Sequence, residues 1–141
     1  LGLDADGISD LLNKKSGVLG ITQLSSDMRE VEAACEKGDP KAILSMKMYN
    51  YRIKKYIGAY AAAMGGVDII VFTAGVGENQ WSTRQEACEG LEFLGVKIDK
   101  ELNKGLRGVE KVISTADSKV TVCIIPTDEE LMIATDTMEL L

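Results

Sequence analysis

The chain has 141 residues, a length typical of one domain with its own hydrophobic core. Hydrophobic residues make up 45% of the sequence and charged residues 27%, a balance that excludes a disordered or collagen-like chain. No apolar run approaches the ~20 residues that a membrane-spanning helix needs. The formal net charge of −6 argues against nucleic acid as the main partner, because phosphate binding requires concentrated positive charge.

The sequence contains no histidine and three cysteines, which limits the chemistry that this chain can perform by itself. The absence of histidine excludes a Ser-His-Asp triad, a Cys-His pair and a histidine-ligated metal. Cys35, Cys88 and Cys123 are widely spaced and form no CxxC motif, which indicates reduced thiols in a cytoplasmic protein. Carboxylates, Lys, Arg and backbone amides remain, and this set suits phosphate chemistry with a hard cation.

The first part of the chain has the spacing of apolar residues that is typical of helices. We predict helices over residues 6–15, 27–37 and 39–64. A break is expected over residues 16–20. Asp27 and Glu30 match a capping box, and Asp39 precedes Pro40 at the predicted start of the third helix. The broad apolar face of that helix indicates packing in a core or an interface.

The second part of the chain mixes strand and helix patterns. We predict strands over residues 67–72, 111–115 and 120–125, and helices over residues 82–89, 99–106 and 127–141. The strand over residues 67–72 lacks alternation, as expected of a strand buried on both faces, and a loop is expected over residues 73–79. The order of elements indicates one α/β domain over residues 1–141, with a helical portion (1–66) followed by an α/β portion (67–141).

The loop after the first strand is a candidate phosphate-binding segment. Gly75 and Gly77 let the backbone take positive φ and approach a ligand closely. The N-terminus of the following helix would offer unpaired N–H groups and a dipole that favours anions. The alternative is a tight strand-to-helix turn, because the segment matches neither a P-loop nor a complete GxGxxG fingerprint.

Charged segments at two predicted helix starts are further candidates. Arg29 in a first turn is electrostatically unfavourable unless it faces a phosphate, a base or a carboxylate. Alternatively, Asp27 is an ordinary cap and Arg29 is a solvated side chain. At the last helix, Thr127 and Glu130 match a capping box, which accounts for acidic residues in the first turn. This box does not require Glu129, whose carboxylate could instead hold Mg²⁺ through water.

Together these segments resemble the acetate kinase family, in the same order and with the same spacing. The matching stretches are SSDMR (residues 25–29), VFTAGVGEN (residues 71–79) and IIPTDEEL (residues 124–131). Residues 16–26 also resemble the segment that leads into the SSDxR motif of the family. The resemblance covers nearly the whole chain, but only about the C-terminal third of a complete family member.

The resemblance implies an RNase H-like domain of the acetate and sugar kinase/Hsp70/actin superfamily. It also implies a homodimeric enzyme that transfers the γ-phosphoryl group of ATP to acetate with Mg²⁺, giving acetyl phosphate and ADP. The nucleotide-binding residues that it implies are Asp27, Met28, Arg29, Gly75, Val76, Gly77, Glu78 and Asn79. The implied Mg²⁺ ligand is Glu129. The catalytic groups of the family are expected upstream of Leu1, so we expect this chain to be inactive alone.

Other interpretations stay open. A propionate kinase or butyrate kinase would differ in the carboxylate pocket, where one methylene is worth only ~1–3 kcal/mol. A non-catalytic nucleotide-binding or dimerisation module would differ from the enzyme in what lies upstream of Leu1. An Hsp70-like or actin-like ATP switch fits the superfamily, but not the GVGEN and PTDEEL segments.

Overall fold

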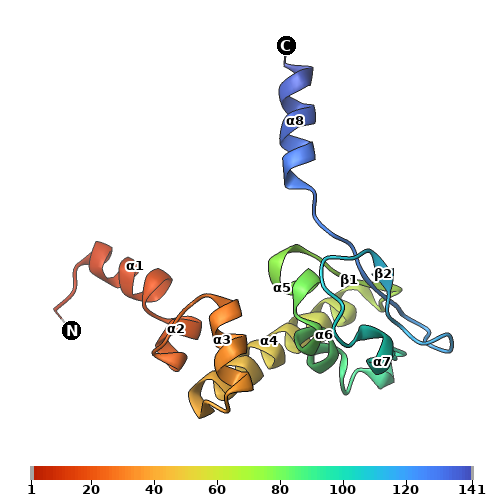
Figure 1. The fold of residues 1–141 in the computed structure, drawn as a ribbon, viewed down its shortest axis with the longest axis horizontal. Helices are drawn as coiled ribbons and strands as arrows, with labels where there is room; N and C mark the ends of the chain where they lie inside the picture. Colours follow the sequence, from red (N-terminus) through yellow and green to blue (C-terminus); the bar gives the residue numbers. More distant parts are fainter. Residues whose placement is uncertain (1, 141) are drawn as a thin grey trace. The chain divides into compact units, whose positions relative to one another are not determined.

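The computed structural model describes residues 2–140, and the chain divides into two compact units, residues 1–57 and 58–141 (Figure 1). The first unit is helical, and the second combines a sheet with helices. The α/β class expected from the order of elements is therefore confirmed, whereas the division into portions 1–66 and 67–141 stays a prediction. No helix in the described part of the chain combines the length and hydropathy needed to span a bilayer.

The first unit is built from helices whose starts follow the capping residues of the sequence. Its helices are α1 (Ala5–Lys14), α2 (Gly17–Thr22), α3 (Met28–Glu36) and α4 (Pro40–Met64), the last of which continues into the second unit. Asp39 Oδ1 accepts hydrogen bonds from the N–H groups of Lys41 and Ala42, as expected of an N-cap. The break expected over residues 16–20 is wrong, because α2 occupies this segment until Gln23 ends it in the left-handed region.

The core of the first unit lies between α3 and α4. Val31 is fully buried and packs with Ala42 and Met46. Partly buried apolar residues surround this cluster: Val18, Met28, Ala34 and Cys35. Met28, a residue of the SSDMR motif, therefore contributes to the packing that holds α3 in place.

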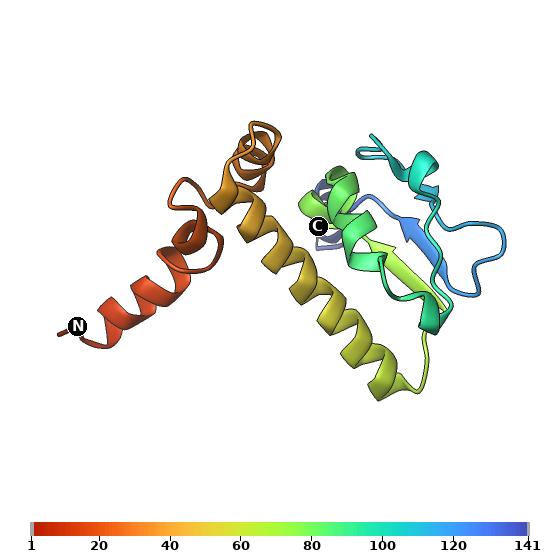
Figure 2. The same ribbon diagram turned by 90° about the horizontal axis from the view of Figure 1, so that it is seen from below.

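The second unit contains a small mixed sheet (Figure 2). Its strands are β1 (Ile69–Phe72), β2 (Lys111–Val112) and β3 (Thr121–Ile124), in the order β1-β3-β2. β1 runs parallel to β3, with Phe72 opposite Ile124, and β2 runs antiparallel to β3. The carboxyl ends of β1 and β3 therefore lie at the same edge of the sheet.

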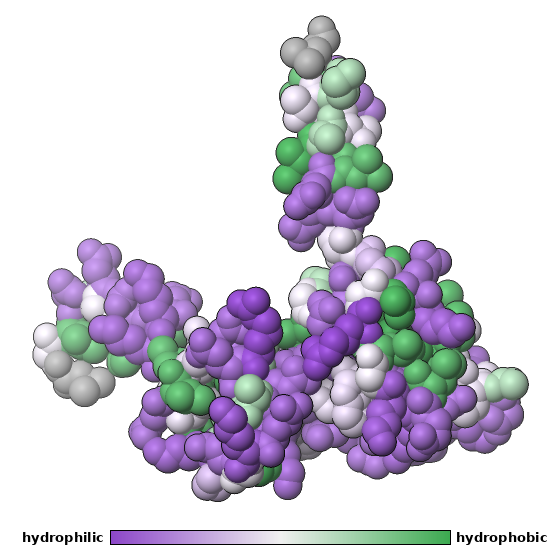
Figure 3. Space-filling model, in the orientation of Figure 1, coloured by the Kyte–Doolittle hydropathy of each residue, from purple (hydrophilic) through white to green (hydrophobic). Residues whose placement is uncertain are grey.

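Helices connect and follow these strands. They are α5 (Ala74–Asn79), α6 (Trp81–Cys88), the 3-10 turn η1 (Glu92–Leu94), α7 (Lys100–Asn103) and α8 (Glu129–Glu139). The loop expected over residues 73–79 is wrong, because α5 begins directly after Thr73. Side chains on α8 are exposed, and Figure 3 shows hydrophobic residues on its surface. The end of this helix was expected at Leu141, which lies outside the described residues.

One face of the sheet is covered and the other is open. Ile70 and Phe72 are buried, whereas Ile69 is 58% exposed and Val71 is 45% exposed. The expectation that this strand is buried on both faces is therefore wrong for this chain. The covered face belongs to a core of fully or nearly fully buried residues that includes Val96, Ile113, Val120, Val122 and Ile124.

Candidate functional site

The glycine-rich segment and the acidic segment meet at the carboxyl ends of β1 and β3. The N–H of Ile125 donates to the carbonyl of Phe72, so the chain leaves both strands side by side. Beyond this bond, Thr73 Oγ1 and Thr127 Oγ1 are 2.7 Å apart, and the N–H of Ala74 donates to Thr127 Oγ1. Two motifs that are distant in the sequence are therefore joined directly, at the edge of a parallel strand pair where α/β proteins commonly bind ligands.

An open cavity of about 400 Å³ lies at this junction. It is lined by Ala74, Gly75, Glu78, Thr127, Asp128, Glu129 and Glu130. One wall is thus glycine-rich backbone, and the other is a row of carboxylates at the start of α8. Backbone that a phosphate can approach, opposite carboxylates that can hold a hard cation, is an arrangement suited to a nucleotide–Mg²⁺ complex.

The two glycines of this segment have different surroundings. A Cβ atom built on Gly75 meets nothing within 4 Å, and Gly75 lines the cavity. A Cβ atom built on Gly77 would lie 3.1 Å from the carbonyl carbon of Phe72, which is tighter than ordinary contact. Gly75 therefore leaves space for a ligand, whereas Gly77 permits α5 to pack closely against β1.

Two polar side chains of this segment hold the site together. Glu78 Oε1 accepts a hydrogen bond of 2.7 Å from the N–H of Thr127, which links α5 to the acidic segment. Asn79 Nδ2 donates to the carbonyl of Gly75 within α5. Ala74 has φ 57°, a left-handed conformation that is uncommon outside glycine and is often found at functional sites.

The start of α8 is capped differently from the expected pattern. Asp128 Oδ1 accepts a hydrogen bond from the N–H of Leu131, so Asp128 is the N-cap and the capping box of Thr127 and Glu130 is wrong. Thr127 is thereby available for its contacts with the glycine-rich segment. Glu129 lines the cavity from the first turn of α8.

A divalent cation at this junction would need ligands beyond the protein. Among the residues that the structure describes, no group of three or more His, Cys, Asp or Glu side chains is arranged to hold a metal ion. Mg²⁺ usually binds through one or two carboxylates, with waters and substrate phosphates completing its octahedral shell. The carboxylate of Glu129 fits this mode of binding, because the cavity leaves room beside it for water and phosphate.

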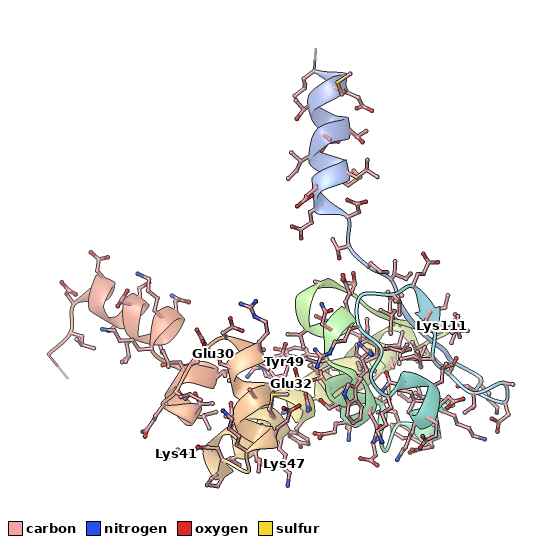
Figure 4. The ribbon with its side chains drawn as sticks, in the orientation of Figure 1. Glu30, Glu32, Lys41, Lys47, Tyr49 and Lys111 are labelled. Carbon is pink, nitrogen blue, oxygen red and sulfur yellow. The ribbon has the colours of Figure 1, made fainter. Side chains whose placement is uncertain are left out.

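The SSDMR motif forms the start of α3 in the first unit. Asp27 caps the helix by accepting from the N–H of Arg29, and its carboxylate also pairs with the Arg29 guanidinium at 2.6 Å. This pair accounts for an Arg in a first turn, and it lowers the pKa of Asp27 from 3.8 to about 2. A capping box would need the N–H of Asp27 to donate to the side chain of Glu30, which projects from the first turn of α3 in Figure 4. This N–H donates to Ser25 Oγ instead, so the predicted capping box is wrong. The Arg29 side chain is 88% exposed.

Sequence reasoning missed two residues at the site. Thr73 joins the two motifs through its hydroxyl, and Arg84 donates hydrogen bonds to the carbonyls of Gly77 and Glu78. Neither carries a local signal, because a Thr after a strand and an Arg inside a helix are ordinary. Both depend on contacts between segments that only the fold brings together.

Comparisons with known proteins find relatives along nearly the whole chain. A sequence model described as the Acetokinase family matches residues 1–135. The acetate kinase of Phocaeicola vulgatus is 71% identical over 140 residues, which cover 99% of this chain and 35% of that protein. The chain therefore spans about a third of the length of the curated relatives it matches.

Solved structures also resemble this chain over about a third of their own length. The crystal structure of Porphyromonas gingivalis acetate kinase matches 98% of this chain with a TM-score of 0.92 and 62% identity, and the match covers 35% of that protein. A propionate kinase from Francisella tularensis matches 94% of this chain with a TM-score of 0.82 and 37% identity, covering 33% of its own length.

Proposed function

Because the chain belongs to the acetokinase family, we propose that it forms the C-terminal, nucleotide-binding and dimerising part of an acetate kinase. Its fold is that of the acetate and sugar kinase/Hsp70/actin superfamily, to which its structural neighbours belong. The proposed reaction is the reversible transfer of the γ-phosphoryl group of ATP to acetate, giving acetyl phosphate and ADP. The observation that carries this proposal is the direct contact of the glycine-rich and acidic segments around one cavity.

The proposed roles follow from the surroundings of each residue. Gly75 and Val76 present backbone to the nucleotide, while Gly77, Glu78 and Asn79 fix the shape of that backbone. In the first unit, the proposed nucleotide contacts are Asp27, Met28 and Arg29. The exposed guanidinium of Arg29 is suited to a phosphate or a base once a ligand competes with Asp27 for it.

Glu129 is the proposed anchor for Mg²⁺, held directly or through water. The ion would neutralise charge on the phosphates during transfer. The residues of this chain bind and orient the nucleotide, and Thr127 and Glu78 hold the acidic segment at the correct edge of the sheet. Phosphoryl transfer depends on positioning and charge stabilisation, so a chain with only one side of the site should not turn over alone.

Acetate is the proposed acceptor because the curated relatives at 64% and 71% identity are named acetate kinases. The likeness to a propionate kinase is weaker in sequence, at 37% identity. The fold does not discriminate between these acids, because one methylene changes binding in an apolar pocket by only ~1–3 kcal/mol. Propionate kinase or butyrate kinase activity is therefore the second candidate.

A homodimer in the cytoplasm is the proposed state of the full-length protein. α4 exposes large apolar side chains, which favour association with another surface: Leu44, Met48, Tyr51, Tyr56 and Tyr60. The cysteines form no disulfide within the described residues, in keeping with a reducing compartment.

The proposal is tested with the full-length protein that carries this segment. Formation of acyl phosphate from MgATP is assayed with acetate, propionate and butyrate side by side. We expect a clear preference for acetate. Preference for a longer acid would change the substrate and retain the mechanism, whereas no acyl phosphate from a folded protein would favour a non-catalytic nucleotide-binding module.

A further inference from the structure

A fully buried arginine lies directly behind the glycine-rich segment. Arg84, on α6, is 0% exposed and is the largest of the fully buried side chains. Within residues 2–140 no carboxylate forms an ion pair with it. Burial of a cation is costly unless its donors are satisfied, so the partners of this guanidinium explain why it is tolerated.

The partners of Arg84 are oxygens on three separate segments. Nη1 donates to the carbonyls of Gly77 at 2.8 Å and Glu78 at 2.9 Å, both on α5. Nε donates to Asn103 Oδ1 at 2.8 Å, and Nη2 donates to the carbonyl of Leu106 at 2.7 Å. These bonds fix α5 to α7 and to the loop that follows α7.

Two opposing electrostatic effects act on the guanidinium of Arg84. The carbonyls of Gly77 and Glu78 belong to the C-terminal end of α5, where the exposed carbonyls carry partial negative charge. Burial lowers the pKa of Arg84 to about 10, and the nearby charge of Arg107 acts in the same direction. The guanidinium therefore stays charged at neutral pH.

Glu78 transmits this restraint to the acidic segment. Its carbonyl accepts hydrogen bonds from Arg84 and from the N–H of Gly108 at 3.1 Å. Its side chain accepts from the N–H of Thr127, which lies two residues before Glu129. Fixing the backbone of Glu78 thus restricts both the glycine-rich wall of the cavity and the loop that carries the carboxylates.

We propose that Arg84 is a positioning residue for the nucleotide site, holding the glycine-rich segment directly and the acidic segment through Glu78. This inference rests on the proposed function and adds a residue that does not line the cavity. Arginine suits the role because its planar guanidinium directs several donors along fixed lines. A lysine has one compact charged group and would not satisfy oxygens on three segments at once.

The test compares Arg84→Lys and Arg84→Met with Ile113→Val in the full-length protein. Ile113 is also fully buried in this unit, so its variant reports a loss of packing alone. We expect both Arg84 variants to raise the KM for MgATP about tenfold or more, while the KM for acetate stays within about twofold. The Ile113 variant should lower the melting temperature and leave both KM values unchanged.

An Arg84→Lys protein that is less stable but has an unchanged KM for MgATP would overturn the inference, because the arginine would then serve folding alone. Equal increases of both KM values would overturn it too. If Arg84→Met does not fold, Arg84→Lys decides the question.

Should the wild-type protein produce no acyl phosphate, the proposed function fails, and the same variants are compared by the Kd for MgADP in calorimetry. A weaker Kd for the Arg84 variants alone would still support positioning, and an unchanged Kd would refute it.

Discussion

The carboxylate of Glu78 accepts a hydrogen bond of 2.7 Å from the backbone N–H of Thr127, across 49 residues of sequence. This bond, together with the contact between the hydroxyls of Thr73 and Thr127, closes the junction of the two motifs. A hydrogen bond from a backbone amide to a charged carboxylate is stronger than one between neutral groups. Glu78 is thus better described as the link between the walls of the site than as a ligand for the nucleotide alone.

The effect of replacing Glu78 on kcat/KM for MgATP should therefore depend on whether the new side chain can still accept this hydrogen bond. In Glu78→Gln the Oε1 acceptor remains, and we expect kcat/KM for MgATP to fall by no more than about threefold. In Glu78→Ala the amide of Thr127 loses its partner, and a decrease of about tenfold or more is expected. Steady-state kinetics of the full-length protein measure both values. Equal effects of the two substitutions would show that charge, rather than the bond to Thr127, is what matters.

Alanine substitutions at the two glycines should separate ligand binding from folding. Gly77→Ala places a Cβ 3.1 Å from the carbonyl carbon of Phe72, so we expect a loss of about 1–3 kcal/mol in the free energy of unfolding. Gly75→Ala meets no protein atom within 4 Å and should change stability by less than about 0.5 kcal/mol, while raising the KM for MgATP. Denaturant titration and kinetics give the two quantities. The reverse pattern would exchange the roles assigned to these glycines.

The sequence predicts the features of this site that depend on neighbouring residues, but not those that depend on tertiary contacts. Asp27 and Asp39 are N-caps as expected, because capping depends on neighbouring residues only. The sequence predicts a loop where the structure has α5, because glycine is a poor helix former and the contacts that stabilise this short helix come from Arg84 and Thr127. The contact with Thr127 spans 49 residues of sequence, and the contacts with Arg84 depend on how α6 packs against α5, so no local pattern reveals them.

The burial of the first strand shows the same difference. Its β-branched composition predicts a strand, which the structure confirms, because that preference belongs to the segment itself. The prediction that both faces are covered was wrong, since Ile69 and Val71 remain exposed in this chain. Burial depends on what packs against the sheet, and a strand pattern does not supply that information.

Removal of the Glu129 carboxylate should weaken the dependence of the reaction on Mg²⁺. The side chain lines the cavity but is not the N-cap of α8, a role that belongs to Asp128. We therefore expect Glu129→Gln to raise the Mg²⁺ concentration needed for half-maximal activity about tenfold or more, with little change in melting temperature. The matched variant Glu130→Gln, in the same first turn, should have the smaller effect. An unaltered Mg²⁺ dependence in Glu129→Gln would leave this residue with only an electrostatic role at the helix start.

The pairing of Asp27 with Arg29 predicts a dependence of stability on pH. The pair lowers the pKa of Asp27 from 3.8 to about 2, so the folded state favours the ionised carboxylate. A group with a lowered pKa stabilises the fold fully above its unfolded pKa, and this contribution is lost as the pH falls through the folded value. The difference in melting temperature between wild type and Asp27→Asn should thus be constant above about pH 5 and shrink between about pH 4 and pH 2.

Thermal unfolding of the full-length protein between pH 7 and pH 2 measures this difference. Asp27→Asn retains a side-chain oxygen that can cap α3, so it removes chiefly the charge interaction with Arg29. Arg29→Gln is the matched control, because it removes the other partner of the same pair. Both variants should converge with the wild type over the same pH range. Because both groups are exposed, salt should reduce the difference at neutral pH, and a difference that persists unchanged at pH 2 would contradict the pairing as its cause.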